Sequence, residues 1–151
     1  NAGHEATVHT LGNALKTLLP LTFRDVTPAL VEEVLRYDPP LHVFTRHAYK
    51  DIDCFGLEIK KGQEVACVLA AANRDPAFAE NPNRFDPTRK LSQHQSFGSG
   101  LHFCVGAPLA RLEISIGLQI LFDRCPNLQI SEAPRYADTY HFHGLTQLMV
   151  R

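Results

Sequence analysis

The chain has 151 residues, about the length of one ordinary domain. Its 44% apolar and 21% charged residues are typical of a globular protein, and its net charge of −1 argues against a nucleic-acid-binding surface, which would be basic. No stretch approaches the roughly 18 uninterrupted apolar residues of a membrane span, and no secretory signal is visible. The chain begins at Asn1 inside a helical pattern, which we interpret as a piece of a longer protein.

Two helices are predicted at the start of the chain. Apolar residues at helical spacing in residues 1–19 form one face, and Pro20 ends this helix. Thr27 is the predicted cap of the second helix, which includes residues 28–37 and has proline in its first turn. The sequence Asp-Pro-Pro then stops it.

The middle of the chain favours strands. Residues 43–45, 52–59 and 64–69 have the composition of strands, and a turn at residues 60–62 joins the last two. A short helical turn is predicted at residues 70–73.

A long irregular run over residues 75–99 leads into a third helix. Such a run is uncommon in a compact domain unless it has a function. The helix is predicted at about residues 105–124, with Pro108 tolerated in its first turn. Strand-like pieces follow at residues 128–130 and 147–150.

The glycine-rich segment at residues 97–106, Phe-Gly-Ser-Gly-Leu-His-Phe-Cys-Val-Gly, carries the most chemistry. Its glycines let the backbone turn tightly and approach a flat partner closely. Cys104 comes just before the third helix, where unpaired N–H groups and the helix dipole stabilise a thiolate. Taken alone, such a cysteine is more often a small buried hydrophobe. The four cysteines contain no C-x-x-C pair, which argues against structural zinc.

Four positions of this segment, Phe97, Gly100, Cys104 and Gly106, fit the haem-loop signature F-x-x-G-x-x-x-C-x-G. The chain therefore resembles the cytochrome P450 family. The resemblance implies haem b as cofactor, with Cys104 as the thiolate ligand of its iron, a ligand that favours O–O cleavage. His102 stands where the family usually has a basic residue.

Arg46 matches the position where similar proteins bind a haem propionate through a forked ion pair. The alternative is a strand arginine that faces water. The candidate cofactor-binding residues are Cys104, His102, Arg46, Phe97, Gly98 and Gly106, with Cys104 as the metal ligand.

The resemblance extends over the whole chain. It implies a mainly α fold with a small β-sheet, of which residues 1–151 are the carboxy-terminal, haem-binding part of one larger domain. Glu33 and Arg36 resemble the family's E-x-x-R helix and share a helical face. The Pro-Asn-Arg-Phe sequence around Arg84 resembles the P-x-R-F element. The implied buried trio of Glu33, Arg36 and Arg84 fixes the irregular run beneath the haem.

Residues 2–7, Ala-Gly-His-Glu-Ala-Thr, resemble the family's central helix motif (A/G)-G-x-(D/E)-T. Gly3 would leave room for dioxygen, and Glu5 would belong to the proton route. Ala6 stands where threonine is expected. Thr7 is the next candidate, but a helix turns by about 100° per residue, so we expect Thr7 to point elsewhere. A substrate hydroxyl or an ordered water could replace the missing threonine hydroxyl at Ala6, or the protein could catalyse a reaction other than ordinary hydroxylation. We favour the first two explanations.

Several further residues have two interpretations each. The candidates for the substrate pocket wall, which fit ordinary core equally well, are Leu41, Val43, Phe44, Gly144 and Leu145. His141 and His143 alternate on a possible strand and are interpreted as incidental rather than as metal ligands. The basic residues that form either a docking face for a ferredoxin-type electron donor or a solvated surface are Arg89, Lys90, Arg111 and Arg124.

The function that the resemblance implies is a cytoplasmic monooxygenase. It would insert one oxygen atom from dioxygen into a small organic substrate, with no nucleic-acid or membrane partner. A haem-binding module without turnover is the alternative, and a globular domain that matches the motif by chance is the third.

Overall fold

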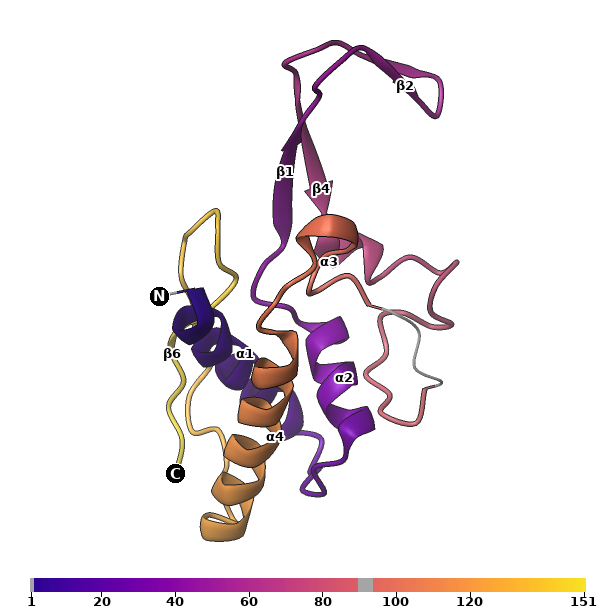
Figure 1. Cartoon of the computed structure of the whole chain (residues 1–151). Coiled ribbons are helices and arrows are strands. Elements are labelled where there is room, and N and C mark those ends of the chain that lie inside the picture. The colour runs from indigo at the N-terminus through magenta and orange to yellow at the C-terminus, as the bar shows by residue number, and fades with distance from the viewer. Residues whose placement is uncertain (1, 90–93) are drawn as a thin grey trace.

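The computed structural model describes residues 2–89 and 94–151. Its fold is mainly α with small sheets, and three long helices dominate it (Figure 1). They are α1 (Ala2–Leu18), α2 (Pro28–Tyr37) and α4 (Ala107–Arg124), and they pack against one another. Within the described residues, none of the helices is long and apolar enough to cross a membrane.

The hydrophobic core lies where the three helices meet. Its most deeply buried side chains include Leu18 of α1, Leu30 of α2, and Ile114 and Leu118 of α4. The buried positions of α4 recur at spacings of three to four residues or multiples of them, so one face of this helix packs on α1 and α2. The core fixes the relative positions of α1 and α4, and these two helices carry most of the site described below.

The predicted cap and bounds of α2 are confirmed. Thr27 has extended backbone angles, and its Oγ1 accepts a hydrogen bond from the N–H of Leu30 at 3.1 Å. Pro28 occupies the first turn, and Asp38 ends the helix. α1 and α4 also match the predicted helices closely, although α4 begins at Ala107. The short helix α3 (Leu69–Ala72) corresponds to the predicted helical turn.

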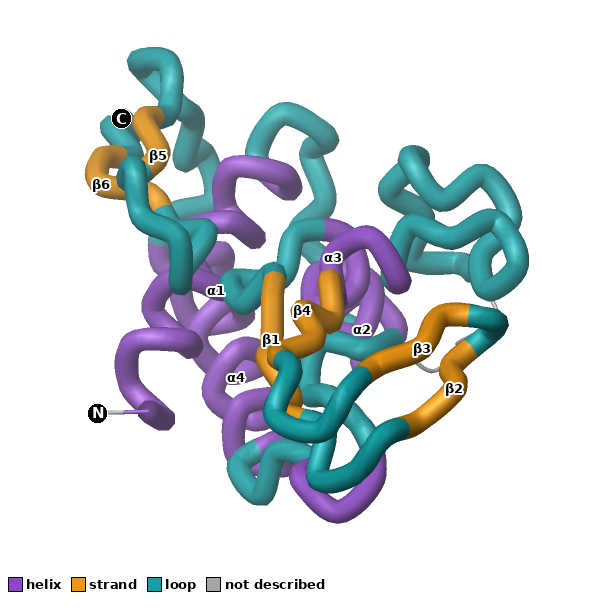
Figure 2. Tube along the Cα trace, turned by 90° about the horizontal axis from the view of Figure 1, so that it is seen from above, coloured by secondary structure: helices purple, strands orange, loops and turns teal. Residues whose placement is uncertain are grey.

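The prediction of one strand over residues 52–59 is wrong. Two strands, β2 (Ile52–Cys54) and β3 (Leu57–Ile59), pair as an antiparallel hairpin (Figure 2). Phe55 and Gly56 between them have φ angles of 54° and 80°, as the tight turn of a hairpin requires. An asparagine or glycine is usual at the first of these positions, and the phenylalanine there hid the turn.

The remaining strands form two more two-stranded sheets. β1 (Val43–His47) pairs antiparallel with β4 (Glu64–Val68), so the predicted turn at residues 60–62 connects strands that do not pair with each other. β5 (Arg135–Tyr136) pairs with β6 (Leu145–Gln147). The predicted pieces at 128–130 and 147–150 are reduced to a single bridge between Ile130 and Val150 and to the end of β6.

Candidate active site

A cavity of about 310 Å³ lies between α1, the glycine-rich loop and the start of α4. Its walls are mostly apolar, and Cys104 and His102 are among its lining residues. From α1 it is lined by Gly3, Ala6, Thr7 and Thr10. From α4 it is lined by Leu109, Ala110, Glu113 and Ile114. The sequence therefore brings residues from opposite ends of the chain to one pocket.

The backbone of the glycine-rich loop holds Cys104 at the mouth of α4. The N–H of Cys104 donates to the carbonyl of Phe97 at 3.0 Å, and its own carbonyl accepts from Ala107 at 3.2 Å. A short 3₁₀ turn, η1 (Gly100–His102), precedes the cysteine, and Gly100 has a φ angle of 70° that favours glycine. Cys104 is exposed, and it lies two residues before Gly106, the N-cap of an 18-residue helix. This position stabilises negative charge on sulfur.

Gly98 brings the loop against β1. Its φ angle is 69°, and a Cβ atom there would lie 3.4 Å from Cε2 of Phe44. Phe44 in turn lines the cavity. Gly98 is thus explained by a close approach within the protein, and its predicted contact with a cofactor stays a prediction.

The residues around the cavity fit a haem ligated through Cys104. Cys104 lines the cavity at a thiolate-stabilising position, and α1 contributes the small residues Gly3 and Ala6 to the lining. A Cβ atom at Gly3 would meet no protein atom within 4 Å, so the protein's own packing does not require glycine there. A Cβ atom at Gly106 would lie 3.8 Å from the sulfur of Cys104, so glycine at this position leaves space beside the sulfur.

Arg46 lies at the edge of this arrangement. It is two residues beyond Phe44 on β1, and alternate residues of a strand share a face. Its guanidinium is 5.9 Å from the Phe44 ring and donates to the carbonyl of Thr45 at 2.8 Å. Its side chain is exposed, so it remains accessible to an anionic ligand group at the cavity rim.

The expectation that Thr7 points away from the site is wrong. Thr7 lines the cavity together with Ala6, because a cavity this broad meets the whole stripe of α1 at positions 3, 6, 7 and 10. The Thr7 hydroxyl lies 2.9 Å from the carbonyl of Gly3 and 3.2 Å from Oε2 of Glu113. Glu5, in contrast, is not among the lining residues.

Glu113 was not predicted as a site residue. It is a carboxylate on the cavity-facing side of α4, within hydrogen-bonding distance of a hydroxyl on α1. The sequence signal was an acidic residue in the middle of a largely apolar helix, which a solvated surface position explains equally well. Only the packing of α4 on α1 shows which way it points.

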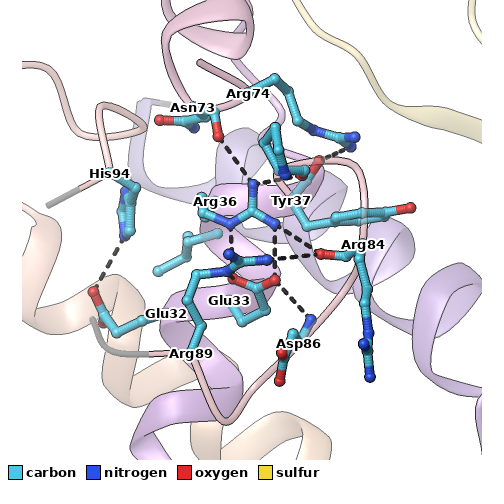
Figure 3. Close-up of polar contacts among 12 residues, drawn as sticks. Glu32, Glu33, Arg36, Tyr37, Asn73, Arg74, Arg84, Asp86, Arg89 and His94 are labelled. Carbon is cyan, nitrogen blue, oxygen red and sulfur yellow. Dashed lines mark hydrogen bonds and ion pairs between the residues drawn. The ribbon is translucent and has the colours of Figure 1, made fainter. Parts of the chain in front are cut away.

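A buried ion pair lies behind the cysteine loop (Figure 3). Nε and Nη2 of Arg36 donate to the two carboxylate oxygens of Glu33 at 2.7 and 2.8 Å, and both side chains are less than 5% exposed. Nη1 of Arg36 also donates to the carbonyls of Asn73 and Pro82, at 2.9 and 3.0 Å. The N–H of Asp86 donates to Glu33 at 2.8 Å. The pair thus fastens the irregular run to α2.

The expected place of Arg84 in this trio is wrong. Its side chain is exposed and points away, and only its carbonyl takes part, accepting from Arg36 at 3.3 Å (Figure 3). Arg89 takes its place as the third member, with Nε of its guanidinium 3.5 Å from Oε2 of Glu33. A turn in which the N–H of Arg89 donates to the carbonyl of Asp86 folds the chain back over α2.

A second charged network holds the other end of the loop. Nε and Nη2 of Arg111 donate to the two oxygens of Glu32 at 2.5 and 2.9 Å, and Nε2 of His94 lies 3.2 Å from Glu32. The Arg111 guanidinium also lies 4.7 Å from the Phe97 ring. Sequence reasoning missed this network because its three members are far apart in the chain.

The network changes the interpretation of the predicted basic face. Arg89 and Arg111 are occupied by carboxylates, and Lys90 lies outside the described residues. Arg124 is exposed at the end of α4.

Acid is expected to weaken the Glu32 network. Burial raises the pKa of Glu32, but the hydrogen bonds from Arg111 and His94 outweigh it and lower the pKa from 4.5 to about 2. A depressed folded-state pKa contributes stability above the unfolded value, and this stability is lost as pH falls from about 4.5 towards 2. Urea unfolding midpoints should therefore drop more steeply over this range in the native protein than in Glu32→Gln. Parallel curves for the two proteins would contradict the assignment.

Only some of the residues predicted for the substrate pocket wall line the cavity. Leu41 and Phe44 line the cavity, whereas Val43, Gly144 and Leu145 do not. Gly144 instead packs on His9, whose ring would overlap a Cβ atom at this position. The four cysteines are free, and Cys67 and Cys125 are exposed.

Comparison with known proteins gives a consistent result. Residues 21–139 match the family model described as Cytochrome P450. The chain is 42% identical to a putative cytochrome P450 140 of Mycobacterium bovis, over 99% of this chain and 36% of that protein. It is 41% identical to the biotin biosynthesis cytochrome P450 of Bacillus subtilis, over 99% of this chain and 40% of that protein.

Solved structures agree with the sequence relatives. P450BioI, in a complex with an acyl carrier protein that carries hexadec-9Z-enoic acid, has a TM-score of 0.91 and 41% identity, over 99% of this chain and 41% of that chain. CYP109E1 from Bacillus megaterium with testosterone has a TM-score of 0.92 and 34% identity, over 99% of this chain and 44% of that chain. The chain thus spans about two fifths of the length of these relatives. It belongs to the cytochrome P450 family.

Proposed function

We propose that the chain is the carboxy-terminal, haem-binding part of a haem-thiolate monooxygenase. The observation that carries the proposal is the cavity lined by both Cys104 and the small residues of α1. Bound haem would supply dioxygen activation at its iron, favoured by a thiolate ligand. A redox partner would supply electrons, and we propose a ferredoxin-type donor in the cytoplasm.

In this proposal the chain's own residues position and tune the cofactor. Cys104 provides the thiolate, which the start of α4 holds in its charged form. His102 lines the cavity, and the Arg46 guanidinium lies 5.9 Å from the ring of Phe44, another lining residue; these positions support a role for both in binding anionic groups of the cofactor.

The substrate proposed for this site is a small, largely apolar organic molecule. Leu41 and Phe44 give the cavity an apolar wall beside β1. The ligands of two structural relatives, testosterone and a fatty acid carried by acyl carrier protein, are also largely apolar. A screen for substrate-induced spin shifts on the full-length protein identifies the compound.

Thr7 and Glu113 are the groups that we propose to hold a proton at the cavity. Their oxygens lie 3.2 Å apart, and Ala6 beside them has no hydroxyl. Together they can orient an ordered water or a substrate hydroxyl and deliver a proton from the carboxyl group of Glu113.

Glu113→Gln should lower product formation by about 100-fold at unchanged reductant consumption, because a positioned acid contributes at least about that factor. Ala6→Thr should raise the fraction of reductant that yields product. Glu5→Gln is the matched control, since both carboxylates are exposed but only Glu113 lines the cavity. Product formation that falls with Glu5→Gln but not with Glu113→Gln would assign the proton route to Glu5.

A haem-binding module without turnover is the second candidate, because the chain covers only about two fifths of its relatives' length. Two measurements on the haem-loaded full-length protein distinguish the monooxygenase from the module. One is the absorption spectrum of the reduced protein under carbon monoxide, and the other is product formation with dioxygen and reductant. A red-shifted, thiolate-type spectrum with product supports the monooxygenase. The same spectrum without product from any spin-shifting compound supports the module.

A further inference from the structure

A second cluster of metal-binding side chains lies outside the haem cavity, where the end of α2 meets the tail of the chain. Asp38 ends α2, His42 precedes β1, and His143 comes from the segment before β6. Each offers one ligand atom, and these atoms lie within 4.8 Å of one another. Nε2 of His143 is 3.2 Å from Oδ1 of Asp38, close to the separation of two ligands on a tetrahedral metal.

Neighbouring side chains form hydrogen bonds with Asp38, as the groups around the ligands of a metal site do. Lys16 Nζ and Tyr136 OH donate to Oδ2 of Asp38, at 2.6 and 3.2 Å, which leaves Oδ1 directed at His143. Such partners fix the orientation and tautomer of metal ligands and raise their basicity.

We propose that Asp38, His42 and His143 form a binding site for a divalent transition metal, with Zn²⁺ as the fitting ion. Two imidazoles and one carboxylate are a ligand set that suits zinc, and three protein ligands leave one position for water. The side chains of Asp38 and His143 are 12% and 32% exposed, so the ion can reach the site from solvent.

Two features set the strength of this site. The rings of His42 and His143 stack with centroids 4.3 Å apart and planes at 25°, so one ring must rotate for both nitrogens to point at one ion. The Lys16 ammonium beside Asp38 repels a second cation.

An ion at this site would connect the tail to the wall of the haem cavity. Phe142, next to His143, forms a bridge with Leu41, and Leu41 lines the cavity. The N–H of His143 also donates to the carbonyl of Pro40 at 2.7 Å. Metal binding would therefore hold the tail against the segment that leads into β1.

The test is calorimetric titration of Zn²⁺ into the haem-loaded, full-length protein after removal of metals with a chelator. We expect His143→Ala and His42→Ala each to lower the zinc affinity by at least ~10-fold, since loss of even an outer-shell partner costs about 10–100-fold. His141→Ala is the matched control, because this histidine is two residues from His143 and outside the cluster. Zinc should also raise the melting temperature of the native protein, but not that of His143→Ala.

The proposal is overturned if the native protein takes up no zinc, or if both His143→Ala and His42→Ala bind it unchanged. Equal losses in His141→Ala and His143→Ala would also overturn it, because they would place the ion elsewhere on the tail. The haem spectrum of each variant shows that it is folded.

Discussion

Cys104→Ser is expected to abolish the thiolate-type spectrum of the reduced, carbon-monoxide-bound protein and to eliminate product formation. A serine hydroxyl is nearly isosteric, but it stays protonated at neutral pH even just before the start of α4, so the electron-rich sulfur ligand is lost. The measurements are the absorption spectrum of the haem-loaded, full-length protein and single-turnover product analysis. Haem uptake itself should persist in part, because the cavity walls on α1 and α4 are unchanged.

Cys125→Ser is the matched control for this experiment. Its thiol is also exposed and also lies next to α4, but at the opposite end of the helix and outside the cavity lining. We expect a native spectrum and native activity. A thiolate-type spectrum that survives in Cys104→Ser would remove Cys104 as the ligand and, with it, the proposed function.

Glu33→Gln is expected to destabilise the protein by about 3–5 kcal/mol, measured as the change in the free energy of unfolding in urea. The substitution leaves the guanidinium of Arg36 charged and only 3% exposed, with no carboxylate to compensate it. Two of the carbonyls that Arg36 also contacts, those of Pro82 and Arg84, belong to the irregular run, so this run should become more susceptible to proteolysis. Loss of haem at lower temperature should accompany the loss of stability.

Arg84→Met tests whether Arg84 or Arg89 completes the buried ion pair of Glu33 and Arg36, since the sequence predicted Arg84 and the structure shows Arg89. Because the Arg84 side chain is exposed and only its carbonyl is used, the substitution should change stability by less than about 0.5 kcal/mol. Arg89→Met should cost more, since this guanidinium contacts Glu33. A large loss in Arg84→Met together with a small one in Arg89→Met would restore the original assignment.

The sequence predicted those parts of the fold that local chemistry determines. The bounds of α2 followed from Thr27, Pro28 and the prolines after Asp38, and these signals act within a few residues. The β2–β3 hairpin was missed because Phe55 adopts a left-handed conformation that its residue type disfavours.

The site was predictable only where a continuous motif carries it. Cys104 and its loop form one uninterrupted segment, and the structure places that segment on a cavity. Glu113, Arg89 and the Glu32 network depend on which helix faces which, and neither spacing nor residue type contains that information. Thr7 is a similar case. It follows Ala6 by one residue and should therefore point in another direction on the helix, but the cavity is wide enough to contact both residues.

The close contact between Gly98 and Phe44 has a consequence for protein engineering. Phe44 forms part of the pocket wall, and the backbone that leads to Cys104 rests on its ring. A designer who reshapes this wall for a bulkier or smaller compound thereby alters the support of the Cys104 loop. Under the proposed function, substrate selectivity and haem ligation by Cys104 would therefore not be independently adjustable at position 44. Leu41, which has no such contact with Gly98, is the safer place to begin a library.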